Sequence, residues 1–163
     1  MNNIFKLGID IGSTTVKIAL LDTEGKIIYS DYRRHRSSPQ DTLSDILFDV
    51  IDTVGDKEVC INITGSGSIN LGKALDIPFV QEVAAVARSL KHYYPQTDVA
   101  IELGGEDAKI IYFDNGIEER MNGVCAGGTG SFIDQMAALL QTDAPGLNAA
   151  AEDYRQIYPI AAR

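Results

Sequence analysis

The residues of this chain best suited to chemistry form a short polar turn near its N-terminus. Asp10 precedes the turn, Gly12 opens it and Lys17 follows it. Glycine lets backbone N–H groups approach an anion closely, and neighbouring hydroxyls add hydrogen-bond donors. The hydroxyl residues of the turn are Ser13, Thr14 and Thr15. Because lysine adds positive charge and a carboxylate can hold magnesium through water, the turn predicts a phosphate site with its metal. An ordinary hairpin with a polar turn is the alternative.

The same arrangement returns later in the chain at a constant offset of 92 residues. The matched pairs are Asp10 and Glu102, Gly12 and Gly104, Lys17 and Lys109, Ile18 and Ile110, and Asp22 and Asp114. An internal repeat of this kind indicates two lobes built on one plan. We expect their turns to face each other across one polyphosphate, and the doublet is more specific than either turn alone.

The elements that must position the first turn are strands, because apolar and polar residues alternate on both sides of it. In a first lobe, residues 1–95, we expect strands at about 5–11, 16–20 and 26–32, a helix at about 39–53, a strand at 59–63, a helix, a brief strand at 78–80 and a helix at 82–93. In a second lobe, residues 96–163, we expect strands at 99–103, 108–113 and 117–121, a helix ending near Leu140, and at most one further helix within 144–158.

Two other polar stretches resemble binding motifs, and neither is interpreted as a site. Residues 67–74 nearly match a P-loop, but Ala74 stands where that pattern needs a Ser or Thr to reach magnesium. A short basic run, from Arg33 to Arg36, is interpreted as a solvated strand end rather than a ligand site.

A glycine-rich loop precedes the helix that ends near Leu140. It contains Gly127, Gly128 and Gly130, and Cys125 lies just before the expected helix N-terminus. The positive end of a helix dipole favours a thiolate. Such a thiolate would be a nucleophile, a redox thiol or a metal ligand. A buried, inert cysteine is the alternative.

The overall composition argues against several classes of protein. A formal net charge of −9 makes nucleic acid an unexpected partner. No apolar run approaches the roughly 18 residues of a membrane span, and no signal peptide is visible at the N-terminus. The two cysteines, Cys60 and Cys125, form no disulfide framework, which favours a reducing, cytoplasmic location.

Three motifs, at 8–17, 102–109 and 121–132, together resemble those of the ATP-dependent activators of 2-hydroxyacyl-CoA dehydratases and the related ATPase subunits of benzoyl-CoA reductase. The likeness covers nearly the whole chain. It implies an α/β, ribonuclease H-like fold, shared with acetate kinase, sugar kinases, actin and the heat-shock chaperone ATPases. Glu106 stands where the smaller activators usually have glutamine, which resembles the long multidomain activases and leaves the substrate open.

The resemblance also implies cofactors, partners and residue roles. ATP or ADP, Mg²⁺ and a 4Fe–4S cluster are the implied cofactors, and ATP hydrolysis would drive a low-potential electron from a ferredoxin or flavodoxin into a dehydratase or CoA-ester reductase. Asp10 would hold magnesium and act in catalysis with Glu106 and Asp107, while Cys125 would bind the cluster of a homodimer in which each chain donates two cysteines. The implied nucleotide-binding residues are Gly12, Ser13, Thr14, Thr15, Lys17, Gly104, Gly105, Gly128 and Thr129.

The chain is shorter than the resemblance requires, since only residues 141–163 follow Leu140. We therefore expect an N-terminal fragment of a longer protein, with one complete lobe and an incomplete second lobe. The resemblance implies that it lacks the second cluster cysteine and the adenosine loop, so we expect no cluster and weak nucleotide binding from this chain alone. A small-molecule kinase of the same superfamily and a non-enzymatic actin-like assembly module remain as alternatives.

Overall fold

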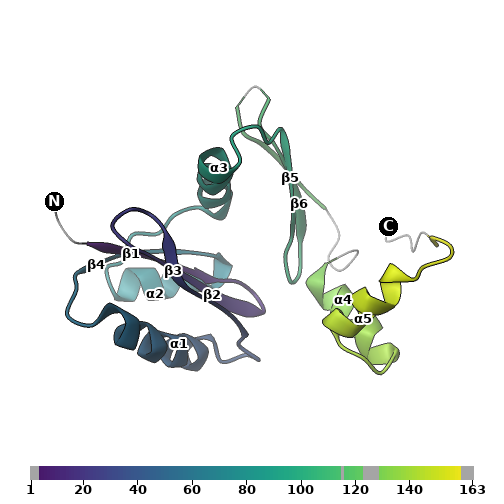
Figure 1. Cartoon of the computed structure of the whole chain (residues 1–163), viewed down its shortest axis with the longest axis horizontal. Coiled ribbons are helices and arrows are strands. Elements are labelled where there is room, and N and C mark those ends of the chain that lie inside the picture. The colour runs from purple at the N-terminus through teal and green to yellow at the C-terminus, as the bar shows by residue number, and fades with distance from the viewer. Residues whose placement is uncertain (1–3, 115, 123–128, 159–163) are drawn as a thin grey trace. The chain divides into compact units, whose positions relative to one another are not determined.

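The computed structural model describes residues 4–114, 116–122 and 129–158. They fall into two compact units, Met1–Pro95 and Gln96–Arg163, each with a sheet of its own. Both units combine strands with helices (Figure 1), which confirms the α/β class expected from the sequence.

The first unit contains a four-stranded sheet in the order β3-β2-β1-β4. Strands β1 (Phe5–Ile11), β2 (Thr15–Leu21) and β3 (Ile27–Arg34) form an antiparallel meander. Strand β4 (Val59–Thr64) then joins β1 in parallel. Parallel neighbours need a crossover, and helix α1 (Pro39–Val54) supplies it.

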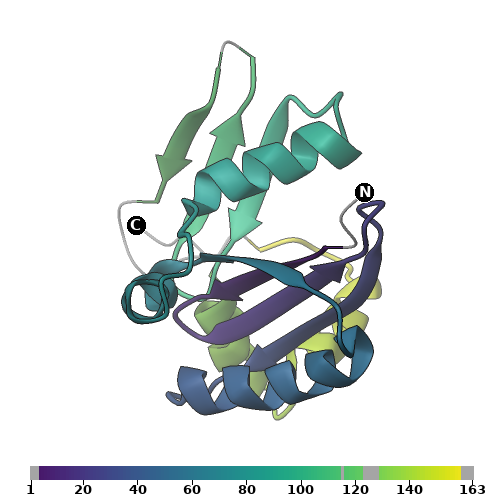
Figure 2. The same cartoon turned by 90° about the vertical axis from the view of Figure 1, so that its left-hand side faces the viewer.

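The buried apolar side chains of this sheet form one core cluster with those of α1. The helix lies along one face of the sheet (Figures 1 and 2). Ile9 on β1 is paired in register with Ile18 on β2 and with Ile63 on β4, and all three are buried. The helix supplies apolar residues three or four positions apart, which is the spacing of one helical face. These buried residues are Leu43, Ile46, Val50 and Val54. Burial of each aliphatic side chain stabilises the fold by roughly 1.5–3 kcal/mol, so a one-residue slip of register would be costly.

The chain after β4 is helical where the sequence resembles a P-loop. A 3₁₀ turn, η1 (Ser66–Ser68), leads into the short helix α2 (Ile69–Ala74), and α3 (Glu82–Tyr93) follows with the bounds expected from the sequence. The P-loop-like stretch is therefore divided between a 3₁₀ turn and a single short helix.

The brief strand expected at 78–80 is reduced to one parallel bridge, between Ile63 and Phe79. The backbone N–H of Ile63 donates to the carbonyl of Pro78 at 3.0 Å, and that of Val80 donates to the carbonyl of Ile63 at 2.8 Å. Proline has no N–H to donate, so the ladder cannot extend through residue 78.

The second unit contains a three-stranded antiparallel sheet in the order β5-β6-β7. Its strands are β5 (Val99–Leu103), β6 (Ala108–Tyr112) and β7 (Glu118–Met121), with bounds within one residue of those expected. Helices α4 (Gly130–Leu139) and α5 (Ala144–Glu152) follow.

The two hairpins β1–β2 and β5–β6 share one register. Asp10 pairs with Lys17 across the first, and Glu102 pairs with Lys109 across the second, so the 92-residue offset holds in the hydrogen-bonded ladders. This confirms the predicted equivalence of the two lysines within their hairpins.

Candidate functional site

An ion pair lies at the base of the first turn, between β1 and β2. Nζ of Lys17 donates a hydrogen bond to Oδ2 of Asp10 at 2.9 Å. The two side chains are 43% and 22% exposed, respectively. A pair this open to solvent stabilises the fold by at most about 1 kcal/mol. The Lys17 ammonium is the more exposed of the two charges.

The other carboxylate oxygen of Asp10 is buried and has no hydrogen-bond partner among the described residues. Oγ1 of Thr64 is likewise buried and has no hydrogen-bond partner among these residues. Asp10 and Thr64 are register partners on the parallel strands β1 and β4, so their side chains leave the same face at the carboxyl end of both strands. Buried polar atoms are nearly always paired, so these two oxygens mark a place that water or a ligand would complete.

These two oxygens fit a hydrated magnesium ion. Magnesium prefers oxygen ligands and usually keeps several of its waters, whose hydrogens need acceptors. Oδ1 of Asp10 and the hydroxyl of Thr64 are both able to accept such hydrogen bonds. The donor set at this strand end is therefore suited to the metal that the sequence predicts.

Gly65 is required for this arrangement. Its φ of +91° lies in the region that favours glycine, and a Cβ atom there would collide with Oδ1 of Asp10 and with the backbone of Ile11. The backbone of Gly65 thus covers the Asp10 carboxylate on one side, which explains how an oxygen at a strand end is buried.

The backbone of the first turn is held by its own ladder and by the residue after β3. Gly12 N donates to the Thr15 carbonyl at 2.9 Å. Nε2 of His35 lies 3.3 Å from the Gly12 carbonyl oxygen, and the His35 N–H donates to the Thr14 carbonyl at 3.1 Å. Ser13 at the tip is exposed.

The basic run from Arg33 to Arg36 is therefore only partly the solvated strand end that the sequence predicts, because two of its residues make contacts within the first unit. His35 contacts the turn, while Arg33 pairs with Asp31 at 2.6 Å and with Asp49 of α1 at 2.7 Å. The hydrogen bonds that the Arg33 guanidinium donates to Asp49 and to Asp31 raise its pKa, and the bond to Asp49 has the larger effect. Arg34 and Arg36 are exposed, as a solvated strand end predicts.

The second turn, between β5 and β6, surrounds a buried lysine. Lys109 is only 8% exposed, with Nζ 3.5 Å from Oδ2 of Asp107 and 3.8 Å from Oε1 of Glu102. Gly104 closes the turn, since its N–H donates to the Asp107 carbonyl at 2.8 Å and a Cβ atom there would collide with the Asp107 carboxylate. Glu106 at the tip is exposed.

The N-terminus of α4 is bonded to this second turn. Gly130 N donates to the Gly104 carbonyl at 2.8 Å, and Ser131 N donates to the Gly105 carbonyl at 2.9 Å. Thr129, just before the helix, is fully buried, and its Oγ1 has no hydrogen-bond partner among the described residues. Three of the predicted nucleotide-binding residues, Gly104, Gly105 and Thr129, are thereby brought together.

Two predicted site residues, Cys125 and Gly128, lie outside the described residues. Cys60 is exposed on β4. Within 4–114, 116–122 and 129–158, no group of three His, Cys, Asp or Glu side chains is arranged to hold a metal ion. In the same residues, no helix is both long and apolar enough to cross a membrane.

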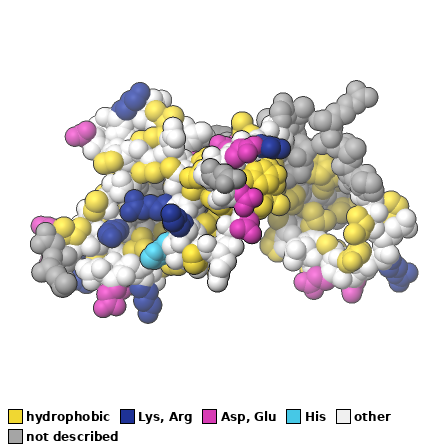
Figure 3. Space-filling model, turned by 90° about the horizontal axis from the view of Figure 1, so that it is seen from above, with side chains coloured by type: hydrophobic (Ala, Val, Ile, Leu, Met, Phe, Trp, Pro, Cys, Tyr) yellow, Lys and Arg dark blue, Asp and Glu magenta, His cyan; other side chains and the backbone are white. Residues whose placement is uncertain are grey.

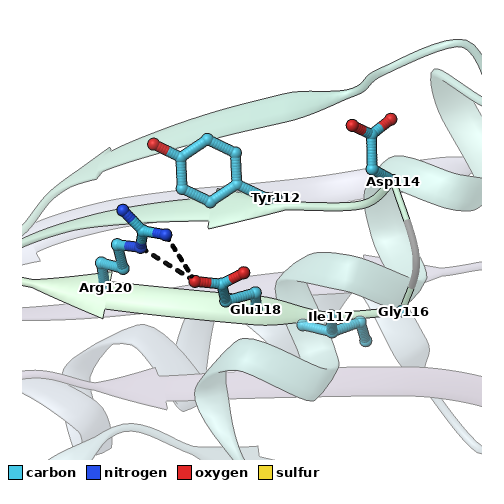
Figure 4. A pocket seen from close by; sticks show the side chains of 6 residues that line it. All are labelled: Tyr112, Asp114, Gly116, Ile117, Glu118 and Arg120. Atoms are coloured by element: carbon cyan, nitrogen blue, oxygen red, sulfur yellow. Dashed lines mark hydrogen bonds and ion pairs between the residues drawn. The ribbon is translucent and has the colours of Figure 1, made fainter.

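A hollow of about 380 Å³ lies at the far end of β6, on the β6–β7 hairpin (Figure 4). It is lined by Tyr112, Asp114, Gly116, Ile117, Glu118 and Arg120. Nη2 of Arg120 is 2.8 Å from Oε1 of Glu118, and the guanidinium lies 5.4 Å from the ring centre of Tyr112. Arg120 and Glu118 are thus paired with each other, and the hollow contains none of the predicted site residues.

Sequence reasoning missed Thr64, Gly65 and His35. A signal for the first two was present, because ligands in α/β sheets bind beyond the carboxyl ends of parallel strands. Thr64 and Gly65 end the apolar alternation of β4. No comparable local pattern marks His35, which reaches the turn only through the pairing of β3 with β2.

Comparison with known proteins adds to this geometry. Residues 7–150 match the model of the BadF/BadG/BcrA/BcrD ATPase family. The chain belongs to this family. Its sequence is similar to that of the 2-hydroxyisocaproyl-CoA dehydratase activator of Clostridioides difficile, with 30% identity over 86% of this chain and 54% of the relative. It is also similar to the (R)-2-hydroxyglutaryl-CoA dehydratase activating ATPase of Acidaminococcus fermentans, with 31% identity over 85% of this chain and 55% of the relative.

Solved structures agree with this assignment. The activator of the 2-hydroxyisocaproyl-CoA dehydratase from Clostridium difficile, with bound ADPNP, superposes with a TM-score of 0.83 at 26% identity, covering 97% of this chain and 60% of its own. Component A of the Acidaminococcus fermentans (R)-2-hydroxyglutaryl-CoA dehydratase gives a TM-score of 0.80 at 27% identity, covering 98% and 62%. These matches confirm the predicted family resemblance and the ribonuclease H-like fold of the actin and sugar kinase superfamily. The chain spans about half the length of the curated relatives it matches.

Proposed function

We propose that this chain is the phosphate-binding part of an ATPase that activates a 2-hydroxyacyl-CoA dehydratase or a related CoA-ester reductase. The observation that carries the proposal is the pair of glycine turns in one register, each with a lysine opposite a carboxylate. The names of the relatives support the dehydratase as partner, and the family supports ATP and ADP as ligands.

In the first turn, Asp10 and Thr64 would hold the water shell of Mg²⁺. Lys17 would keep one carboxylate oxygen of Asp10 in place and add positive charge beside the phosphates. The backbone N–H groups and the hydroxyls of the turn would donate to phosphate oxygens. Bound magnesium would supply charge neutralisation for the phosphates. The hydroxyl residues concerned are Ser13, Thr14 and Thr15.

In the second turn, Gly104 and Gly105 would let a phosphate approach the backbone, and the buried hydroxyl of Thr129 would be a donor near it. Glu106 and Asp107 carry carboxylates at the tip, where they would position water for hydrolysis. Gly128 would extend the same phosphate-binding surface, as the resemblance implies.

We further propose that the whole protein is a cytoplasmic homodimer that passes an electron from a ferredoxin or flavodoxin to its partner enzyme. A 4Fe–4S cluster needs cysteine thiolates, commonly four. Cys125 would be one of two ligands from each chain, and exposed Cys60 on β4 would not be the other. This chain alone would therefore hold no cluster.

The experiment that tests nucleotide binding uses Asp10→Ala, with exposed Asp56→Ala as the matched control. Magnesium-dependent ATP hydrolysis by the full-length protein should fall to background in Asp10→Ala, because the phosphates lose their metal anchor. The Asp56→Ala variant should match the wild type. Undiminished hydrolysis by a folded Asp10→Ala variant would remove Asp10 from the site.

The electron-transfer part is tested separately, by iron analysis of the full-length protein purified without oxygen. The protein should be brown, Cys125→Ser should be colourless, and Cys60→Ser should keep its iron. A colourless, iron-free wild type that still hydrolyses ATP would reject the electron-transfer role and favour the small-molecule kinase.

A further inference from the structure

His35 is the one histidine that touches the first turn, and its hydrogen bonds determine which ring nitrogen carries the proton. The Ser37 N–H donates to Nδ1 at 3.1 Å, so Nδ1 is the acceptor. In the neutral ring the proton then lies on Nε2. Nε2–H faces the Gly12 carbonyl oxygen at 3.3 Å and donates to it.

The segment after His35 is bent to keep this ring in place. Arg36 and Ser37 have φ of 45° and 72°, a region that residues other than glycine rarely adopt. The Ser38 N–H closes the bend by donating to the His35 carbonyl at 2.7 Å. Two consecutive residues in this conformation persist only where surrounding contacts enforce it. The bend brings the Ser37 N–H to Nδ1, so it sets the tautomer.

His35 thereby fixes two peptide units of the turn. Its ring holds the Gly12 carbonyl, and its backbone N–H holds the Thr14 carbonyl at 3.1 Å. A trans peptide is planar, so its N–H points opposite to its C=O. The N–H groups of Ser13 and Thr15 belong to these two peptide units, and the described residues contain no cis peptide bond. Both N–H groups must therefore point away from the bend after β3.

We propose that His35 is a positioning residue that holds the Ser13 and Thr15 N–H groups in the orientation that receives a phosphate. The proposal rests on the proposed function for the identity of the anion, but the orientation itself is a property of the chain without nucleotide. His35 does not contact the phosphate and acts through the carbonyl groups on the opposite side of the peptide planes.

The test begins with the nucleotide-free chain, labelled with ¹⁵N. The chain has two histidines, His35 and His92, so each ring gives its own signals and His92 serves as an internal reference. His35 should be the Nε2–H tautomer at mildly alkaline pH. His35→Phe, which keeps a ring but has no donor, should shift the Ser13 amide resonance and speed its exchange with solvent. His35→Gln, which offers an amide N–H near the position of Nε2, should restore both, and His92→Gln should change neither.

The same variants of the full-length protein are then titrated with Mg·ATP and with magnesium tripolyphosphate. His35→Phe should lose roughly three- to tenfold in affinity, the value of one hydrogen bond, while His35→Gln stays within about twofold of the wild type. An Nδ1–H tautomer, or a Ser13 amide and an affinity untouched by His35→Phe, would overturn the proposal. If the amide responds as expected but the wild type binds neither probe, the positioning role of His35 is supported and the proposed function fails.

Discussion

The hairpins β1–β2 and β5–β6 repeat one pattern in one register, yet their apolar faces meet different surroundings. Ile9 is 3% exposed, whereas its counterpart Ile101 is 71% exposed. In the first unit β4 pairs with β1, and α1 packs on the same face. Among the described residues of the second unit, β5 pairs with β6 alone. The apolar residues of β5, Val99, Ile101 and Leu103, are accordingly exposed, and Figure 3 shows hydrophobic side chains on the face of the molecule that it draws. The alternation thus encodes the hairpin, but burial depends on elements from elsewhere in the chain.

The lysines of the two hairpins show the reverse difference in exposure, since the lysine of the first hairpin is exposed and that of the second is buried. Lys17 is 43% exposed and pairs with Asp10, while Lys109 is 8% exposed and lies near the carboxylates of Glu102 and Asp107. The same lysine of the repeat is therefore exposed to solvent in the first turn and buried in the second.

The largest expected effect compares the two isoleucines of the repeat. Ile9→Ala should lower the free energy of unfolding of the first unit by roughly 2–5 kcal/mol, because it leaves a cavity under α1. Ile101→Ala should change the second unit by less than about 0.5 kcal/mol, as expected for an exposed side chain. Native-state amide hydrogen exchange measures both units separately. Equal losses would show that the apolar face of β5 is buried in solution, which would end the contrast between the hairpins.

An intermediate effect compares the two lysines. Lys109→Met should destabilise the second unit by roughly 1–3 kcal/mol, because it leaves two carboxylates near each other without their cation. Lys17→Met should cost the first unit at most about 1 kcal/mol and should weaken Mg·ATP binding instead. Urea denaturation and calorimetric titration of both variants provide the measurement. A Lys17→Met variant that is strongly destabilised would contradict the division into an accessible and a structural lysine.

The smallest expected effect on stability concerns the two buried threonine hydroxyls, one beside each turn. Thr64→Val and Thr129→Val should leave the free energy of unfolding unchanged or raise it by up to about 1 kcal/mol, since each removes a buried polar atom that has no partner among the described residues. Thr64→Val should nevertheless lower the affinity for Mn²⁺, used as a magnesium probe in the presence of ATP, by roughly three- to tenfold.

Two controls complete this comparison. Thr64→Ser retains the hydroxyl and should bind Mn²⁺ as the wild type does. Thr53→Val removes a hydroxyl that donates to the Asp49 carbonyl on the surface of α1, and it should leave Mn²⁺ affinity unchanged. A Thr64→Val variant with full Mn²⁺ affinity would exclude this hydroxyl from the metal site.

The sequence predicts the strands, their register and the residues of each turn, because these depend on contacts between neighbours in the chain. Asp10 and Lys17 face each other simply because the hairpin is symmetric about Gly12 to Thr15. Contacts between distant segments could not be read in the same way. Thr64 and His35 are brought to the first turn by the pairing of β4 with β1 and of β3 with β2. The sequence shows only the composition of the basic run that contains His35, and that composition predicts a solvated strand end.

The backbone of Gly65 against the Asp10 carboxylate has a consequence for the order of folding. Asp10 lies on β1, which precedes β4 in the chain, but the oxygen that is proposed to face magnesium is enclosed only when β4, on the far side of the α1 crossover, has docked in parallel. Parallel pairing over such a distance forms late, because loop closure precedes its contacts. Metal affinity should therefore appear only with the completed sheet, which makes bound Mn²⁺ a reporter of the pairing of β4 with β1 rather than of the β1–β2 hairpin alone.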